Sequence, residues 1–337
     1  MVVARHDDII DASHRVNSAV VRELVTQSLC LLTKATDERS AWAMLLPGLH
    51  DDHTIGIKIN TVATHLAGHR EVVDAVVASL GTGGVSPDRI VIWDNLGRLD
   101  LLRRLLYGNV NRRSGSYYQG MERAGYAVSR DTAPRVLCTA PMPPGVGYDS
   151  DVLASVPSQG LQLPVTRLLT EVCDHVISIP VPKDHRITGI TCALKNFYGA
   201  VPLWDDLHPG DADRMHRDRG NPQIAELYAD PAIGGRVRLH IVDALAAICD
   251  GGPWGHPQLH PRSLLLSRDP VAIDSYVLDM IDAARAARGM SSVAPRAAYI
   301  ETAAKLQLGA NDPRSIELID QDARPVEWPA DDPNRSN

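Results

Sequence analysis

Three residues that can exchange protons lie close together in the sequence: Lys183, His185 and Lys195 all fall within residues 180–199. An imidazole titrates near neutral pH and serves as a general acid or base. A lysine ammonium is a compact point charge that can lose its proton when it is buried, whereas arginine keeps its charge. We therefore predict that Lys183, His185 and Lys195 are the catalytic residues.

Lysine is scarce in this chain, which makes its positions informative. Only five of the 34 basic residues are lysines, and on most solvated surfaces arginine would serve equally well. The spacing around Lys195 predicts a helix near 188–197 that begins at Thr188 and places Thr191 and Lys195 on one face. Free N–H groups at such a helix start would suit an anion. The predicted substrate-binding residues are Lys58, Asn60, Thr188, Thr191, Asn196 and Tyr198. A capped helix with solvated lysines is the alternative.

Three further predicted strands end on polar residues, namely Asn60, Asp94 and Asp243. In open parallel sheets, ligands bind beyond the carboxyl ends of the strands. We therefore expect Lys58 and Asn60 to approach the same site, with Asp94 or Asp243 orienting a base or binding a cation.

A metal site is a second interpretation. His65 and His69 are four residues apart, the spacing by which one helix face offers two imidazoles to a metal, and with Asp94 they are the predicted ligands of a divalent metal. A metal-dependent hydrolase or lyase would use these residues together with His185 or His208. No Glu completes an H-E-x-x-H pattern, and His69 could instead cap the helix that follows it.

The sequence identifies no cofactor. Its five cysteines include no C-x-x-C pair, so the ligand spacing of an iron–sulfur cluster and of a disulfide framework are both missing. The first predicted strand is not followed by the G-x-G-x-x-G fingerprint of dinucleotide-binding proteins. No G-x-S-x-G elbow of a serine hydrolase occurs either.

The composition limits the kinds of partner that this protein can bind. The chain has 337 residues, is 44% hydrophobic and carries a formal net charge of −7. This acidic balance argues against a nucleic-acid partner, which would need a basic face. No run approaches the ~18 apolar residues of a membrane span, and the N-terminus has no signal-peptide pattern. We expect a cytoplasmic protein with a small-molecule substrate, either as a monomer or as a homo-oligomer.

Strand and helix patterns alternate along the chain, which predicts the α/β class with mostly parallel sheets and right-handed crossovers. The predicted strands are 54–60, 89–94, 175–180, 236–243, 264–267 and 316–319. The predicted helices are 11–32, 38–46, 70–80, 98–106, 116–125, 188–197, 221–229, 269–287 and 295–308. Asp11 and Asp269 are the expected caps of two of these helices.

The expected architecture is two Rossmann-like lobes with flanking helices and a cleft between them. The predicted divisions are an N-terminal lobe at 1–132, a Pro/Gly-rich crossover or lid at 133–164, a C-terminal lobe at 165–325 and a polar tail at 326–337. The second division shows little periodicity and is interpreted as irregular.

Several segments together resemble a bacterial and archaeal family, domain-of-unknown-function family 362. They include G-I-K-I-N at 56–60, I-P-V-P-K-D-H at 179–185, T-G-I-T at 188–191, A-L-K-N at 193–196 and D-P-V-A-I-D at 269–274. Many relatives carry a ferredoxin-like cysteine region or a twin-arginine export signal, so the resemblance implies redox work. Neither feature occurs in this sequence.

The preferred hypothesis is an enzyme that acts on a small anionic, carbonyl-bearing or quinone-type molecule through lysine and histidine acid–base chemistry. The resemblance favours an oxidoreductase, whereas the missing cluster motif favours redox-neutral proton transfer or lyase chemistry. A protein that binds a small anion without turnover is a further alternative, because binding sites use the same residue types.

Overall fold

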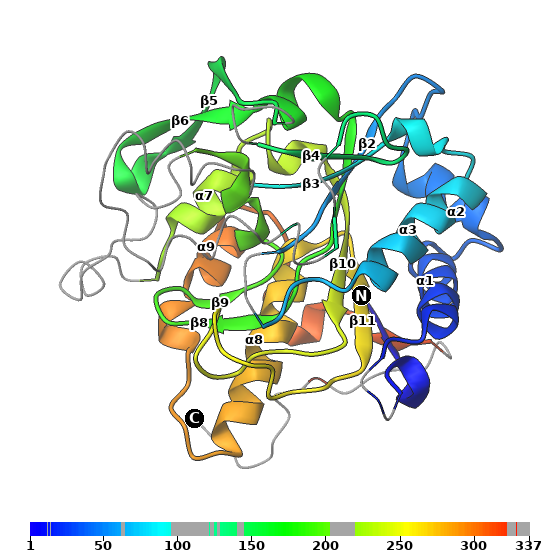
Figure 1. The fold of residues 1–337 in the computed structure, drawn as a ribbon. Helices are drawn as coiled ribbons and strands as arrows, with labels where there is room; N and C mark the ends of the chain where they lie inside the picture. Colours follow the sequence, from blue (N-terminus) through cyan, green and yellow to red (C-terminus); the bar gives the residue numbers. More distant parts are fainter. Residues whose placement is uncertain are drawn as a thin grey trace.

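The computed structural model describes residues 1–11, 13, 15–61, 65–95, 121, 125, 126, 129–139, 145–202, 220–321 and 328. Its centre is an eight-stranded sheet in the order β12-β1-β11-β10-β7-β2-β3-β4 (Figure 1). The strands of this sheet are β1 (Val2–Arg5), β2 (Ile55–Lys58), β3 (Ile90–Asp94), β4 (Arg135–Cys138), β7 (His175–Ser178), β10 (Val237–Ala244), β11 (Ser263–Ser267) and β12 (Ile319–Asp320).

Most neighbouring strands of this sheet are parallel. Strand β11 pairs antiparallel with both β1 and β10, and the other neighbours run parallel. The parallel strands β10, β7, β2 and β3 therefore end at one common edge of the sheet. This edge is where an open parallel sheet presents ligand-binding residues.

Helices cover both faces of the sheet, which gives three layers (Figure 1). The helices on one face are α1 (Ser18–Thr33), α2 (Glu38–Leu45) and α3 (Arg70–Thr82), and those on the other face are α7 (Gln223–Ala229), α8 (Pro270–Ala286) and α9 (Tyr299–Lys305). Alternation along β2 sends Ile55 and Ile57 into the core beneath α1–α3, so Lys58 points to the opposite face. Trp93 on β3 lies in the core of that opposite face.

Two hairpins add to the face that carries α7–α9. One hairpin pairs β5 (Tyr148–Val156) with β6 (Leu161–Thr166), and the other pairs β8 (Lys183–His185) with β9 (Gly189–Thr191). The short 3₁₀ helix η6 (Lys195–Ala200) follows β9. The remaining 3₁₀ or π turns are η1 (Asp7–Ile9), η2 (Pro87–Arg89), η4 (Pro157–Gln159), η5 (Leu168–Val172), η7 (Gly234–Arg236), η8 (Ala294–Arg296) and η9 (Pro313–Ser315).

The predicted α/β class is confirmed, and the strands at 54–60, 89–94, 175–180 and 236–243 correspond to β2, β3, β7 and β10. Helix α8 has the expected cap, because Asp269 accepts hydrogen bonds from the N–H groups of Val271 and Ala272. Helix α1 starts later than predicted: Asn17 rather than Asp11 accepts from its first N–H groups.

Other predicted boundaries are wrong. Residues 133–164 are not an irregular segment, since β4, β5 and the start of β6 lie there. The helix expected at 295–308 is reduced to η8 and α9, and the last strand lies at 319–320 rather than 316–319. Three predicted segments lie largely outside the described residues. They are the helix at 98–106, most of the helix at 116–125, and the polar tail at 326–337 except for Trp328.

The division into two lobes is not confirmed. Strands from both predicted lobes lie side by side in one sheet, since β7 pairs with β2. Within the part of the chain that the structure describes, we find no helix with the length and apolar character needed to cross a membrane.

Candidate functional site

The first component of the site is a buried ion pair between Lys58, at the end of β2, and Asp94, at the end of β3. The Lys58 Nζ lies 2.6 Å from the Asp94 Oδ1 and also donates to the carbonyl of Ile59 at 2.6 Å. Thr61 donates to the second Asp94 oxygen through its backbone N–H and its hydroxyl. Burial lowers the pKa of Lys58, and the Asp94 carboxylate opposes that effect. This pair ties together the ends of two parallel strands.

Two asparagines extend the network from Lys58 to a second lysine. The Lys183 Nζ donates to the Asn60 Oδ1 at 2.7 Å, and the Asn60 amide donates to the Asn196 Oδ1 at 3.3 Å. Asn196 also accepts from the Lys58 Nζ at 3.3 Å and donates to the Ser178 hydroxyl at 3.0 Å. The structure therefore brings together four of the predicted site residues, Lys58, Asn60, Lys183 and Asn196.

Lys195 lies beside this network but is not hydrogen-bonded into it. Within the described residues, its ammonium group makes no hydrogen bond or ion pair, and its contact is with the Tyr198 ring, whose centroid lies 5.3 Å from the Nζ. Burial, together with the neighbouring charge of Lys183, lowers the pKa of Lys195 to about 7. A lysine in such surroundings loses its proton easily.

Lys183 shares this behaviour. Burial lowers its pKa to about 7, against the opposing effects of the Asp94 and Asp243 carboxylates, while Lys58 adds to the lowering. The site thus contains two lysines that titrate near neutral pH. Titration of such interacting groups belongs to the pair rather than to either residue alone.

Asp274 on α8 binds the backbone of the segment that carries Lys195. This fully buried carboxylate accepts hydrogen bonds from the backbone N–H groups of Ala193 at 2.6 Å and Leu194 at 3.2 Å. The Tyr299 hydroxyl donates to the same carboxylate at 3.3 Å. Burial raises the pKa of Asp274 to about 7. Asp274 therefore fixes the backbone just before Lys195.

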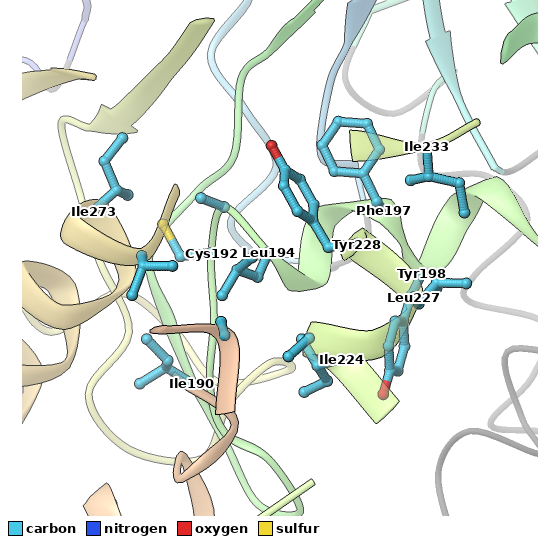
Figure 2. Packing of buried hydrophobic residues seen from close by; sticks show 14 of the residues in the cluster. Ile190, Cys192, Leu194, Phe197, Tyr198, Ile224, Leu227, Tyr228, Ile233 and Ile273 are labelled. Carbon is cyan, nitrogen blue, oxygen red and sulfur yellow. The ribbon is translucent and has the colours of Figure 1, made fainter. Parts of the chain in front are cut away.

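Apolar packing holds the same segment from the side (Figure 2). The Phe197 ring meets the Tyr228 ring of α7 edge-to-face, with centroids 5.4 Å apart. Leu194 and Tyr198 belong to the same buried cluster as Leu227. Residues 194–198 are thus anchored by their apolar side chains, while Lys195 and Asn196 face the polar network.

The prediction of a helix at 188–197 is wrong. Residues 183–191 form the β8–β9 hairpin, in which Lys183 pairs with Thr191 and His185 with Gly189. Gly189 adopts a φ of +76°, and a Cβ at this position would lie 2.7 Å from that of Ala297. A helix cannot pass through this conformation. The hairpin therefore offers no helix N-terminus to an anion, although Thr191 remains next to Lys183 in the ladder.

Thr188 and His185 serve the turn of this hairpin. The Thr188 hydroxyl donates to the carbonyl of Ile190 at 3.0 Å. The His185 Nδ1 accepts from the backbone N–H groups of Ile187 at 3.2 Å and Thr188 at 3.1 Å. Since Nδ1 is the acceptor, a neutral His185 ring carries its hydrogen on Nε2. The catalytic role of His185 stays a prediction.

The three predicted metal ligands have separate partners. The exposed His65 ring stacks on that of His256 at 3.7 Å, His69 pairs with Asp243, and Asp94 pairs with Lys58. Within the described ranges, no group of three or more His, Cys, Asp or Glu side chains is arranged to hold a metal ion. His208, the other metal candidate, lies outside those ranges.

His69 and Asp243 form a pair that the sequence analysis did not anticipate. Both the backbone N–H and the Nδ1 of His69 lie within 3 Å of the Asp243 Oδ2, at 2.6 and 2.9 Å. The Asp243 carboxylate raises the pKa of His69. His69 is the N-cap residue of α3, but its side chain makes no cap hydrogen bond there. The expected cap position is therefore confirmed, while the His69 side chain is bound by Asp243 instead.

Sequence reasoning missed Ser178 and Thr61 as contributors, and it did not decide whether Asp274 points into the site or to the surface. Ser178 could have been found, because it is the one polar residue in the apolar end of the 175–180 strand and is followed by the prolines that lead to Lys183. Asp274 falls in the second turn of a predicted helix, where its sequence position does not distinguish a buried from an exposed carboxylate.

The comparison with known families covers most of these residues. Residues 55–279, more than half of the chain, match the family described as Domain of unknown function (DUF362). The chain belongs to the DUF362 family. The range shared with DUF362 proteins contains every residue of the lysine network and also Asp274, but its description assigns them no activity.

Two further comparisons add little to the DUF362 assignment. No curated protein matches the chain. A solved crystal structure of a Thermotoga maritima protein is similar at 12% sequence identity and a TM-score of 0.37, over 86% of this chain. The chain spans 59% of the length of that protein.

Proposed function

We propose that this DUF362 protein is an enzyme that binds a small anionic, carbonyl-bearing molecule between Lys183 and Lys195 and transfers protons with these lysines. The observation that carries the proposal is the ammonium group of Lys195, which has no hydrogen-bond or ion-pair partner among the described residues and is buried beside a second buried lysine. Two neighbouring cations in a region of low dielectric repel each other, so a bound carboxylate would stabilise both.

Carbonyl substrates fit the protonation behaviour of this pair. A pKa of about 7 for each lysine means that one can act as a base while the other stays an acid at neutral pH. A neutral amine at Lys195 would remove a proton from the carbon next to a carbonyl group. The ammonium group of Lys183 would stabilise the negative oxygen of the resulting enolate.

The hydrogen-bond partners of the two lysines support the assignment of Lys183 as the acid and Lys195 as the base. Lys183 is oriented by Asn60, whereas Lys195 has no fixed polar partner among the described residues. Substrate binding would therefore supply the first polar contact that the Lys195 ammonium makes. Asn60 and Asn196 add amide groups that could contact the polar atoms of the ligand.

A panel of 2-oxo acids tests the proposal, with pyruvate, 2-oxobutyrate and 2-oxoglutarate as its members. Binding is measured by calorimetry, and exchange of the hydrogens next to the carbonyl with D₂O is followed by proton NMR. We expect binding and accelerated exchange for at least one member. Lys195→Met should abolish the exchange, and Lys305→Met, which removes an exposed lysine, should not.

Two outcomes would contradict the proposal. If a 2-oxo acid binds but Lys183→Met and Lys195→Met leave its affinity unchanged, the ligand site lies elsewhere. Tight binding with no exchange above the rate of free lysine would favour the alternative of a binding protein without turnover.

A further inference from the structure

We propose that Lys195 is a nucleophile that forms a Schiff base with the carbonyl carbon of its substrate, which makes aldehydes or ketones bearing a carboxylate the substrate class. This inference rests on the proposed function, since it places the same class of ligand at the same lysine pair. It goes further in assigning a covalent intermediate to one named nitrogen. In this pathway the Lys195 lone pair attacks the carbonyl carbon, so the base that breaks the neighbouring C–H bond is Lys183 in its neutral form.

The free nitrogen of Lys195 is the first argument. Among the residues that the structure describes, the Nζ has no hydrogen-bond acceptor, so its lone pair becomes available as soon as the proton leaves. The residue is buried but keeps 8% of its surface exposed, so it is not completely closed off from solvent. Below it lies the Tyr198 ring, an apolar surface that does not compete for the nitrogen.

The other lysines lack this combination. The Lys58 ammonium is held by Ile59, Asp94 and Asn196, and a carboxylate partner keeps an amine protonated. Lys183 donates to Asn60 and is fully buried. Lys34 and Lys305 are both exposed, and Lys305 pairs with Glu301.

The neighbouring charge is the second argument. A lysine becomes nucleophilic at neutral pH when it is desolvated or placed beside another cation, and Lys195 meets both conditions. Lys183 would also stabilise the oxygen that becomes negative when the carbonyl is attacked. One structural feature thus activates the nucleophile and stabilises the product of its attack.

The chemical step balances without an oxidant or a reductant. The Lys195 lone pair forms a C–N bond to the carbonyl carbon, and the C=O π electrons move to oxygen, which takes up a proton. The nitrogen then gives up one of its two protons, which leaves a neutral carbinolamine. A second proton transfer to the oxygen lets it leave as water, and the nitrogen lone pair closes the C=N bond. The iminium formed in this way carries a positive charge at residue 195, which can accept electrons when a neighbouring C–H bond breaks.

The position of the nucleophile is fixed from both sides. Asp274 binds the N–H groups of Ala193 and Leu194, and Ser178 holds the side chain of Asn196. The backbone at residue 195 therefore has little freedom, and its side chain can return to one attack position in each reaction cycle.

Reductive trapping tests the inference on the intact chain. The protein is incubated with pyruvate and sodium cyanoborohydride, and peptide mass spectrometry locates the reduced adduct. We expect a single predominant adduct on Lys195, with a rate that reaches half its maximum near pH 7. Lactate, which has the carboxylate but no carbonyl group, should bind at the site and give no adduct.

Matched variants keep the test falsifiable. Lys195→Arg retains the charge and should lose the adduct while still binding lactate, and Lys305→Arg should behave as the wild type. If pyruvate and lactate both bind through Lys183 but no adduct forms on Lys195, the Schiff-base inference is wrong and the proposed function stands. If neither compound binds and no adduct forms, both are contradicted.

Discussion

The ammonium group of Lys183 lies 2.7 Å from the side-chain oxygen of Asn60, although the two residues belong to segments 123 positions apart. This bond joins the β8–β9 hairpin to the end of β2. Through Asn60 and Asn196 it connects Lys183 to the Lys58–Asp94 pair. The strand ends and the hairpin therefore form one polar unit, and Lys195 lies at its side with no polar partner in the part of the chain that the structure describes.

The Lys58–Asp94 ion pair is expected to be the most costly part of this unit to break. Asp94→Ala removes the carboxylate and leaves the buried Lys58 charge with neutral partners only. Losing one member of a buried pair costs about 3–5 kcal/mol of unfolding free energy. Urea denaturation at neutral pH measures this loss. Asp51→Ala, at an exposed position, is the control and should change stability by less than about 0.5 kcal/mol.

Lys195→Met should have the opposite effect on stability. The folded-state pKa of Lys195 is about 7, below its ordinary value of 10.5, so its charged form disfavours folding at and below pH 7. Removing it should stabilise the fold by about 1–4 kcal/mol there. The stabilisation by Lys195→Met should shrink as the pH rises from 7 towards 10.5. In this range the folded wild-type lysine is neutral, and the lysine of the unfolded chain loses its proton more and more easily, so folding no longer has to remove it. An equal effect of the substitution at every pH would contradict this prediction.

Asp274 should act on ligand binding through the backbone that it holds. Asp274→Ala leaves the N–H groups of Ala193 and Leu194 without an acceptor and should cost about 2–4 kcal/mol of stability. It should also weaken 2-oxo acid binding. Asp269→Ala removes a carboxylate from the cap of the same helix and should cost about 1 kcal/mol with no change in affinity. Equal losses of affinity in both variants would show that Asp274 has no special connection to the site.

Ligand binding should take up protons. An anion that contacts the Lys183 ammonium group must keep that group charged above its pKa of about 7, while Lys195 can stay neutral. Its affinity should therefore fall by about tenfold per pH unit for each proton taken up, as the pH rises above 7. Calorimetry in two buffers of different ionisation enthalpy measures the number of protons. A pH-independent affinity between about pH 7 and 9 would contradict the role of the pair.

Sequence periodicity was sufficient to predict the strands whose ends form the site. The buried runs of β2, β3, β7 and β10 each precede a polar residue, and parallel strands bring such residues to one edge. The close approach of Lys58, Asn60 and Asp94 follows from that rule. Helix α8 was also predictable, because Asp269 and Pro270 are a standard helix start.

Tertiary contacts decided what the sequence could not predict. The Thr191-to-Lys195 spacing is compatible with a helix, but Gly189 turns the chain into a hairpin against Ala297, which lies over a hundred residues away in the sequence. His69 and Asp243 are 174 positions apart, so no local pattern indicates that they pair. The single sheet depends on the β2–β7 pairing, which joins the two predicted lobes.

NMR of the protein labelled with ¹³C at the lysine ε-carbons measures whether Lys183 and Lys195 titrate near neutral pH, because the chain has five lysines and their signals can be assigned with Lys183→Arg and Lys195→Arg. We expect the signals of Lys183 and Lys195 to titrate with midpoints near 7, and a bound 2-oxo acid to move these midpoints upward. Midpoints at the ordinary value of 10.5 for both lysines, unchanged by any member of the 2-oxo acid panel, would contradict this expectation.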